Sequence, residues 1–235
     1  MWKDIFGKYN LRARLSPCII LISPILINLY LLFESVRTIS TTIIITIVAF
    51  AISNLLVLLA RYNGSKKIRA ILDKKVLAPE ILSPLDRTID LSTKKRYYNF
   101  LNSKIEDLEL NEQLEDEKII KEKCITAVRW LKEYTRHESE FPLVMEENIN
   151  TGFCRNLYGL KIQGIFICLI LIIMLCMFFI IKFGDLSINI SSEIIISVII
   201  DFIYLFLWIF VVNKELINNI YLKYSKALLA CCDKK

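Results

Sequence analysis

One apolar stretch of this sequence carries a carboxylate where a bilayer would have its centre. Residues 193–212 are long enough to cross a membrane as a helix at about 1.5 Å per residue, and Asp201 lies near their middle. An ionised carboxylate at that depth is costly unless it faces water or a partner. At about 100° per residue, one side of this helix collects its polar and amphipathic side chains: Glu193, Ser197, Asp201, Tyr204 and Trp208. The pattern predicts a helix that turns this face inward, onto other helices or around water.

A second group of candidate residues is basic. The segment 61–104 contains eleven Lys and Arg residues against four Asp and Glu residues, and Tyr62, Tyr97 and Tyr98 are interleaved with them. Such a surface suits a phosphate chain whose bases stack on aromatic rings. It equally suits anionic lipid headgroups, which attract polybasic segments. The next segment, 106–117, holds seven acidic residues and no basic one.

Enzymatic chemistry is not indicated. His137 is the only histidine, which excludes a two-histidine metal site, and its spacing from Glu133 is typical of a surface pair. The sequence contains no P-loop, GxSxG or HExxH motif. Its seven cysteines form no CxxC pair and are expected to be free thiols. We therefore expect a non-enzymatic protein with no catalytic residue, no metal and no cofactor.

Four apolar runs must position these residues: 17–33, 42–60, 162–181 and 194–212. Basic residues gather before the first run, around the 61–161 block and after the last run, whereas the two short connections hold one each. The positive-inside rule then places both termini and the 61–161 block in the cytoplasm. The abundance of Ile, Lys and Asn suggests a bacterial genome, so we expect a multi-pass protein of the bacterial inner (plasma) membrane.

The expected fold is an all-α membrane protein with four transmembrane helices in two hairpins and a helical cytoplasmic domain between helices 2 and 3. Its parts are an interfacial amphipathic helix, a first hairpin, a cytoplasmic ligand-binding domain, a second hairpin and a cytoplasmic tail. Their bounds are 1–16, 17–60, 61–161 (with a junction at 141–161), 162–213 and 214–235.

Inside the cytoplasmic domain the sequence predicts helices separated by turns. A turn at 63–65 and an extended connection at 78–84 are expected to separate helices over 66–77, 92–110 and 111–136. Gly152, Gly159 and Gly164 are expected to allow bends in the junction. A bendable junction would pass a rearrangement of the cytoplasmic part to the membrane helices.

Two regions of the chain resemble a family of bacterial four-span membrane proteins with a helical cytoplasmic insert. The first is Asp-Arg-Thr-Ile-Asp at 86–90, followed by Lys-Lys-Arg-Tyr at 94–97. The second is Glu-Asn-Ile-Asn at 147–150, followed by Gly-Phe-Cys-Arg-Asn-Leu-Tyr-Gly-Leu-Lys at 152–161. Where the family has two arginines after Gly-Phe, this chain has Cys154 and Arg155, so one basic contact is missing.

Proteins of this build are similar to membrane effectors of anti-phage systems that work with a nucleotidyltransferase, such as the channel subunit of the Hailong system. The resemblance implies a homo-oligomeric ion channel, a tetramer, whose cytoplasmic part binds a short single-stranded DNA oligomer made by the partner enzyme. Bound DNA would keep the channel closed, and loss of DNA would depolarise the membrane in abortive infection. Two alternatives stay open: a cyclic-nucleotide-gated membrane effector, and a non-conducting scaffold that recruits a cytoplasmic partner through the acidic segment 106–117.

The residues that would serve these roles form two sets. Phosphates would pair with basic side chains and bases would stack on aromatic ones: Lys66, Lys67, Arg69, Lys94, Lys95, Arg96, Arg129 and Arg155, with Tyr97, Tyr98 and Trp130. A pore would be lined by Asp201, which as a ring favours cations, with Ser197, Glu193 and Tyr204. Alternatively, this face is a subunit interface in which Asp201 bonds Asn28, Asn54 or Thr46 of a neighbour.

Overall fold

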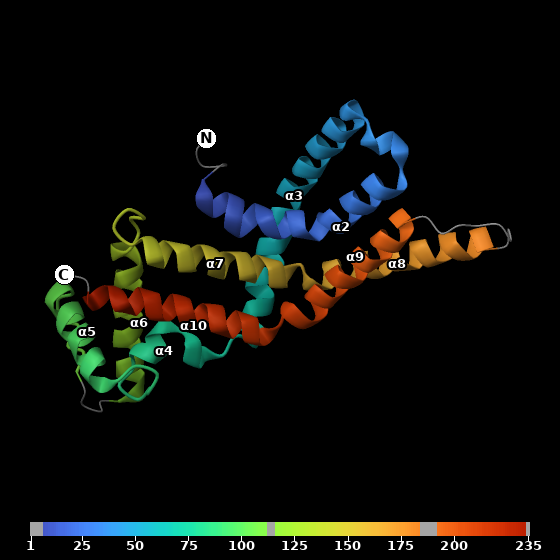
Figure 1. Ribbon diagram of the computed structural model, residues 1–235. Helices are drawn as coiled ribbons and strands as arrows, with labels where there is room; N and C mark the ends of the chain where they lie inside the picture. Colours follow the sequence, from blue (N-terminus) through green and yellow to red (C-terminus); the bar gives the residue numbers. More distant parts are fainter. Residues whose placement is uncertain (1–6, 112–115, 184–191, 234–235) are drawn as a thin grey trace. The chain divides into compact units, whose positions relative to one another are not determined.

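The computed structural model describes residues 7–111, 116–183 and 192–233, with the side chains of 179–183 left out of that description. Within these ranges every regular element is a helix, which confirms the all-helical prediction. The chain forms two compact units (Figure 1). The first unit comprises Met1–Ala70 and Gly152–Asn213, and the second comprises Ile71–Thr151 and Lys214–Lys235. Residues 1–6 of the predicted interfacial helix lie outside the described residues.

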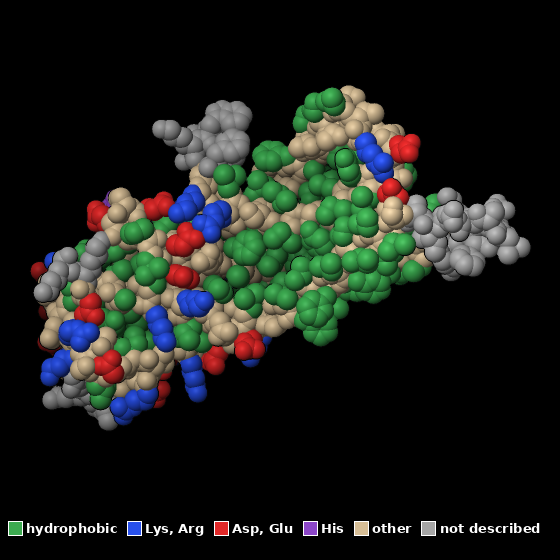
Figure 2. All heavy atoms as spheres, in the orientation of Figure 1, with side chains coloured by type: hydrophobic (Ala, Val, Ile, Leu, Met, Phe, Trp, Pro, Cys, Tyr) green, Lys and Arg blue, Asp and Glu red, His purple; other side chains and the backbone are tan. Residues whose placement is uncertain are grey.

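Four helices of the first unit are long and apolar enough to cross a membrane: Asn10–Leu32, Ile39–Ile71, Lys161–Phe178 and Ser192–Val211. The first joins the π-helix η1 (Asn10–Leu15) to α2 (Ser16–Leu32), and the second is α3 (Ile39–Ile71). The third belongs to α8 (Lys161–Phe183), and the last joins α9 (Ser192–Phe206) to the π-helix η4 (Leu207–Val211). Figure 2 shows hydrophobic side chains dominating the surface of these helices, as a lipid environment favours.

Helices α2, α8 and α9 pack together around a small apolar core. Cys18, Leu21, Cys168 and Trp208 are among its buried members. Gly164 provides the room for this packing, because a Cβ there would lie 2.2 Å from the Trp208 ring. The indole therefore occupies the space that any larger residue at this position would need.

Helix α3 runs without interruption through residues 63–65, where the sequence predicted a turn. Its Gly64 lies against α7 (Pro142–Gly159), since a Cβ at Gly64 would lie 2.6 Å from the carbonyl oxygen of Arg155. A Cβ at Gly159 would lie 2.5 Å from the carbonyl oxygen of Ala60, and Lys67 Nζ donates to Gly159 O at 2.9 Å. Of the three expected bend positions, Gly152 lies inside α7 and Gly164 inside α8, whereas α7 ends at Gly159 and Leu160 separates it from α8. At Gly64 and Gly159 the missing side chain also allows close approach of the neighbouring backbone.

The second unit is built from η3 (Lys74–Val76), α4 (Ala78–Leu82), α5 (Leu91–Lys104), α6 (Glu117–Tyr134), α10 (Lys214–Ala230) and η5 (Cys231–Asp233), with the first part of α7. The hydrophobic core of this unit contains a buried leucine from each of four helices: Leu82 of α4, Leu101 of α5, Leu131 of α6 and Leu228 of α10. The buried positions of α6 lie on one apolar face: Ile120, Cys124, Ala127, Val128 and Leu131.

Three features of the second unit differ from the predicted pattern. Residues 78–82, expected to be extended, form the helix α4 because Pro79 fits its first turn. Helix α5 ends at Lys104, where Asn102 exchanges hydrogen bonds with the backbone of Leu110 and turns the chain. Residues 214–233 do not form a separate tail, because α10 contributes Leu228 and Leu229 to the core. Of the acidic segment 106–117, positions 112–115 lie outside the described residues.

Candidate functional site

The carboxylate of Asp201 is bonded within its own chain to α2. Asp201 is fully buried and Asn28 is 4% exposed. Asn28 Nδ2 donates to Asp201 Oδ1 at 2.9 Å and to the carbonyl oxygen of Pro24 at 2.8 Å. The amide is thereby fixed on its own helix while it bonds the carboxylate of α9. This arrangement joins two membrane-length helices through a polar contact in an otherwise apolar layer.

A second polar contact links the same two helices nearer the η1 end of α2. Pro24 has no N–H, so the carbonyl oxygen of Ile20 lacks its helical donor, and Ser23 Oγ donates to it at 2.9 Å. The hydroxyl of Tyr204 lies 2.7 Å from Ser23 Oγ. Two side chains of α2, Ser23 and Asn28, thus bond the predicted polar face of α9.

Three buried oxygens of this region have no hydrogen-bond partner in the described part of the chain: Asn28 Oδ1, Ser197 Oγ and Asp201 Oδ2. Ser197 and Asp201 are four residues apart on α9 and both are fully buried. Buried polar groups of native proteins nearly always find a partner. Oxygens of this kind suit water, a proton or a small cation. The pore prediction for Asp201 and Ser197 stays a prediction, with Asp201 bonded to Asn28 of α2.

The other residues named for this face have different surroundings. Glu193 is partly exposed at the start of α9, where Ser192 Oγ donates to its Oε2 at 3.3 Å. Thr46 and Asn54 of α3 are exposed and bond carbonyls of their own helix, Thr42 O and Phe50 O, each at 2.8 Å. Within this chain, Asn28 is the partner of Asp201 among the three that the sequence suggested.

Three residues predicted to bind ligand belong to the core of the second unit. Lys94 is fully buried, and its Nζ donates to the carbonyl oxygens of Ser83 at 2.5 Å and Asp86 at 2.7 Å. Burial lowers the pKa of Lys94 and raises that of Tyr97 to about 12. Tyr98, 2% exposed, donates to the carbonyl oxygen of Leu82. Lys94 and Tyr98 thereby hold residues 82–86 onto α5.

The remaining candidates of the second unit are spread over its surface. Arg96 forms a two-pronged contact with Asp233, at 2.9 Å from Nε and 3.1 Å from Nη2. Trp130 stacks on Tyr134 with ring centroids 4.9 Å apart. Lys95 and Arg129 are exposed on α5 and α6. This set does not converge on one pocket in the described structure.

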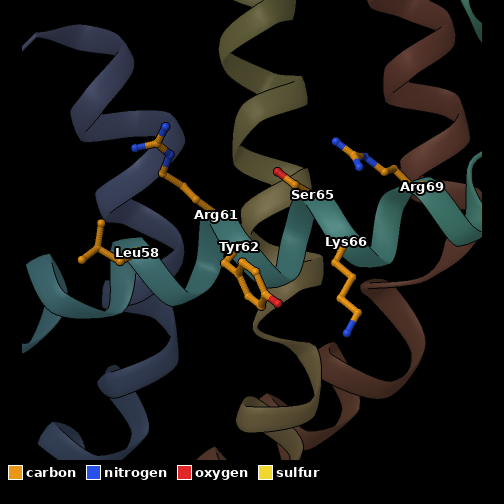
Figure 3. A pocket seen from close by; sticks show the side chains of 6 residues that line it. All are labelled: Leu58, Arg61, Tyr62, Ser65, Lys66 and Arg69. Atoms are coloured by element: carbon orange, nitrogen blue, oxygen red, sulfur yellow. The ribbon is translucent and has the colours of Figure 1, made fainter.

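The structure does bring two predicted residues together on α3. Lys66 and Arg69 line a hollow of about 530 Å³ with further residues of successive turns: Leu58, Arg61, Tyr62 and Ser65. Figure 3 shows these side chains projecting from α3. Lys67 is not among them, because its amine bonds Gly159 O. The packing of Ala60, Gly64 and Ile68 on the opposite side leaves this face of the helix free.

Arg155 lies beside this region with two arginines that the sequence analysis did not select. Arg14 of η1 is close enough to Arg61 and Arg155 for like-charge repulsion. The three residues come from segments far apart in the sequence, so spacing along the chain does not reveal them. The sequence feature that these three arginines share is a position next to the end of an apolar run.

Comparisons of the chain with protein-family models, with curated proteins and with solved structures find no match. Two features of its own geometry bear on the function of this protein. One is the polar contact between α2 and α9, and the other is the basic surface at the ends of α3, η1 and α7.

Proposed function

We propose that this protein is a cation channel in which the facing polar sides of α2 and α9 provide the conduction path. The observation that supports this most directly is the buried hydrogen bond between Asn28 and Asp201, made between two membrane-length helices. Ionisable residues inside membrane segments are rare and usually mark ion or substrate pathways.

A purely structural role explains this site less well than conduction does. Helices in lipid pack adequately through small and apolar side chains, so a carboxylate is not needed to join α2 to α9. The buried oxygens of Ser197 and Asp201, which have no partner among the described residues, also add nothing to packing. Oxygens on one face of α9 are, in contrast, what a dehydrated cation requires in place of water.

The channel proposal includes assembly and control. We take the protein to be a homo-oligomer, a tetramer, in the bacterial plasma membrane with both termini in the cytoplasm. Control would come from a phosphate-bearing signal held by exposed basic residues, with Lys66 and Arg69 as the first choices. The proposed signal is a short single-stranded DNA oligomer made by a partner nucleotidyltransferase, which keeps the channel closed until phage infection removes it.

Ion flux through proteoliposomes containing the full chain tests this function. We expect K⁺ or Na⁺ flux that short single-stranded DNA suppresses and that Asp201→Asn reduces at least tenfold, or about 1.4 kcal/mol in the barrier. Thr46→Val is the matched control, since Thr46 is exposed on another membrane helix and bonds its own backbone. Its flux should equal that of the unmodified protein.

Each part of the proposal has its own contrary result. No flux with or without DNA, or with a cyclic dinucleotide, would favour a non-conducting scaffold. Flux that a cyclic dinucleotide alone controls would keep the channel and replace the ligand. DNA affinity should also fall steeply with salt, because phosphate contacts release counterions. A salt-independent affinity contradicts phosphate recognition by Lys66 and Arg69.

A further inference from the structure

Three arginines of the first unit are brought together by backbone packing: Arg14 of η1, Arg61 of α3 and Arg155 of α7. Arg14 is near enough to the other two to feel their charges. The backbone fixes this arrangement, because Asn156 Nδ2 donates to the carbonyl oxygen of Ala13 at 2.7 Å. Gly64 completes it by allowing α3 to contact the backbone of Arg155.

The described part of the chain supplies one favourable contact to this arginine cluster, because the guanidinium of Arg14 lies 5.3 Å from the centroid of the Tyr9 ring. None of its three side chains forms an ion pair with a carboxylate there. The Nε atoms of Arg14 and Arg155 are buried and have no hydrogen-bond acceptor among the described residues. Guanidinium groups held together in this way repel one another, and a shared anion with several oxygens would remove both the repulsion and the unmade hydrogen bonds.

The position of the cluster along the membrane helices indicates the kind of anion. Arg61 directly follows the apolar run 42–60, and Arg14 lies three residues before the run 17–33. Both therefore lie at the end of a segment that can cross the hydrocarbon layer, where phosphates of lipid headgroups are found. The hollow that Arg61 lines also contains Leu58 on the apolar side and Tyr62, a residue favoured at this boundary.

We propose that the arginine cluster binds the phosphodiester headgroup of an anionic phospholipid, such as phosphatidylglycerol. Paired N–H groups of a guanidinium match the oxygens of a phosphate, and basic pockets between membrane helices select lipids in this way. Leu58 contacts the adjoining apolar part of the lipid. The site uses none of the contacts of Asn28 and Asp201, so it does not depend on the proposed conduction path. Its Arg61 lines the same hollow as Lys66 and Arg69, so competition with DNA must distinguish the lipid from the proposed signal.

The test measures lipid binding by the purified full-length protein, with no flux readout. Native mass spectrometry and thermal unfolding are followed on addition of phosphatidylglycerol or phosphatidylcholine. We expect retention of phosphatidylglycerol and a higher melting temperature with that lipid only. Arg155→Gln and Arg61→Gln should each weaken phosphatidylglycerol binding about tenfold, as expected for the loss of a charge-assisted contact.

Two further variants separate recognition from charge and from folding. Arg155→Lys keeps the charge but loses the paired geometry, so it should also weaken binding, while Lys132→Gln removes an exposed charge of α6 and should not. Equal binding of both lipids, or unchanged binding by all three arginine variants, would overturn the proposal. So would displacement of phosphatidylglycerol by short single-stranded DNA, because the cluster would then belong to the soluble signal.

Discussion

Asn28 Nδ2 donates to Asp201 Oδ1 at 2.9 Å, and together the two residues connect α2 to α9 through buried polar atoms. The same amide group also bonds the carbonyl oxygen of Pro24, so its orientation is set by its own helix. Asp201 therefore meets a donor that is already in position. This pre-set geometry explains how a carboxylate is accommodated between apolar helices while its second oxygen stays available.

Removing the donor should destabilise the protein more than removing a comparable amide elsewhere. Asn28→Ala leaves Asp201 buried without its hydrogen bond, at a cost of about 3 kcal/mol. Thermal unfolding in detergent, followed by tryptophan fluorescence, measures the effect. Asn54→Ala is the control, since Asn54 is exposed on α3 and donates to the carbonyl oxygen of Phe50 on its own helix. Equal losses in the two variants would mean that the contact with Asp201 adds no stability.

The sequence predicted the polar face of α9 because a helical period places Ser197 and Asp201 on one side of an apolar segment. It did not predict that Asn28 of the same chain is the partner. The helical period predicts which side of a helix a residue lies on. It does not predict which other helix packs against that side, because that depends on the tertiary structure. Pro24 was a usable signal: it frees a carbonyl, and Ser23 beside it supplies the donor.

In the basic segment of α5, the number of charged residues does not predict which of them are exposed. Lys94 and Lys95 are adjacent and chemically identical, yet one is fully buried and the other exposed. Lys94 shares a helix face with Tyr97, Tyr98 and Leu101, which are all buried. The spacing of these four residues therefore predicts an inward Lys94. A count of basic residues conceals this, because it assigns every lysine to the surface.

The buried amine of Lys94 should be needed for the fold of the second unit. Lys94→Met keeps most of the side-chain volume but leaves the carbonyl oxygens of Ser83 and Asp86 without their donor. We expect the free energy of unfolding to fall by about 2 kcal/mol. Lys95→Met, on the exposed side of the same helix, should change it little. Denaturant unfolding of both variants in detergent makes the comparison, and similar values would contradict this role.

The close contact between α3 and α7 should depend on Gly159, and a larger residue there should lower the stability of the protein. Gly159→Ala would place a methyl group 2.5 Å from the carbonyl oxygen of Ala60, and backbone cannot rotate away as a side chain does. We expect a loss of about 2 kcal/mol, typical of overpacking. Thermal unfolding in detergent provides the measurement, with Ser65→Ala on the free face of α3 as control. A Gly159→Ala protein as stable as the control would show that the helices separate without penalty.

The buried thiol of Cys124 predicts how stability changes at alkaline pH. Burial raises the pKa of Cys124 from 9.0 to about 12. Between these values the unfolded chain releases the proton and the folded chain keeps it, so the unfolded state gains stability as the pH rises. At pH 10.5 this one thiol should lower the free energy of unfolding by roughly 2 kcal/mol relative to pH 8.

Replacing that thiol should therefore flatten the alkaline part of the stability profile. In Cys124→Ala, the melting temperature should fall less between pH 8 and pH 10.5 than in the unmodified protein. Cys176→Ala, which removes an exposed thiol, should retain the full slope. Tyr97 is present in all three proteins, so its titration cancels in the difference. Lys94 interacts electrostatically with Cys124, so the difference between Cys124→Ala and the unmodified protein includes this coupling. Parallel profiles for the unmodified protein and Cys124→Ala would show that water reaches this thiol in the folded state, contrary to its place in the core.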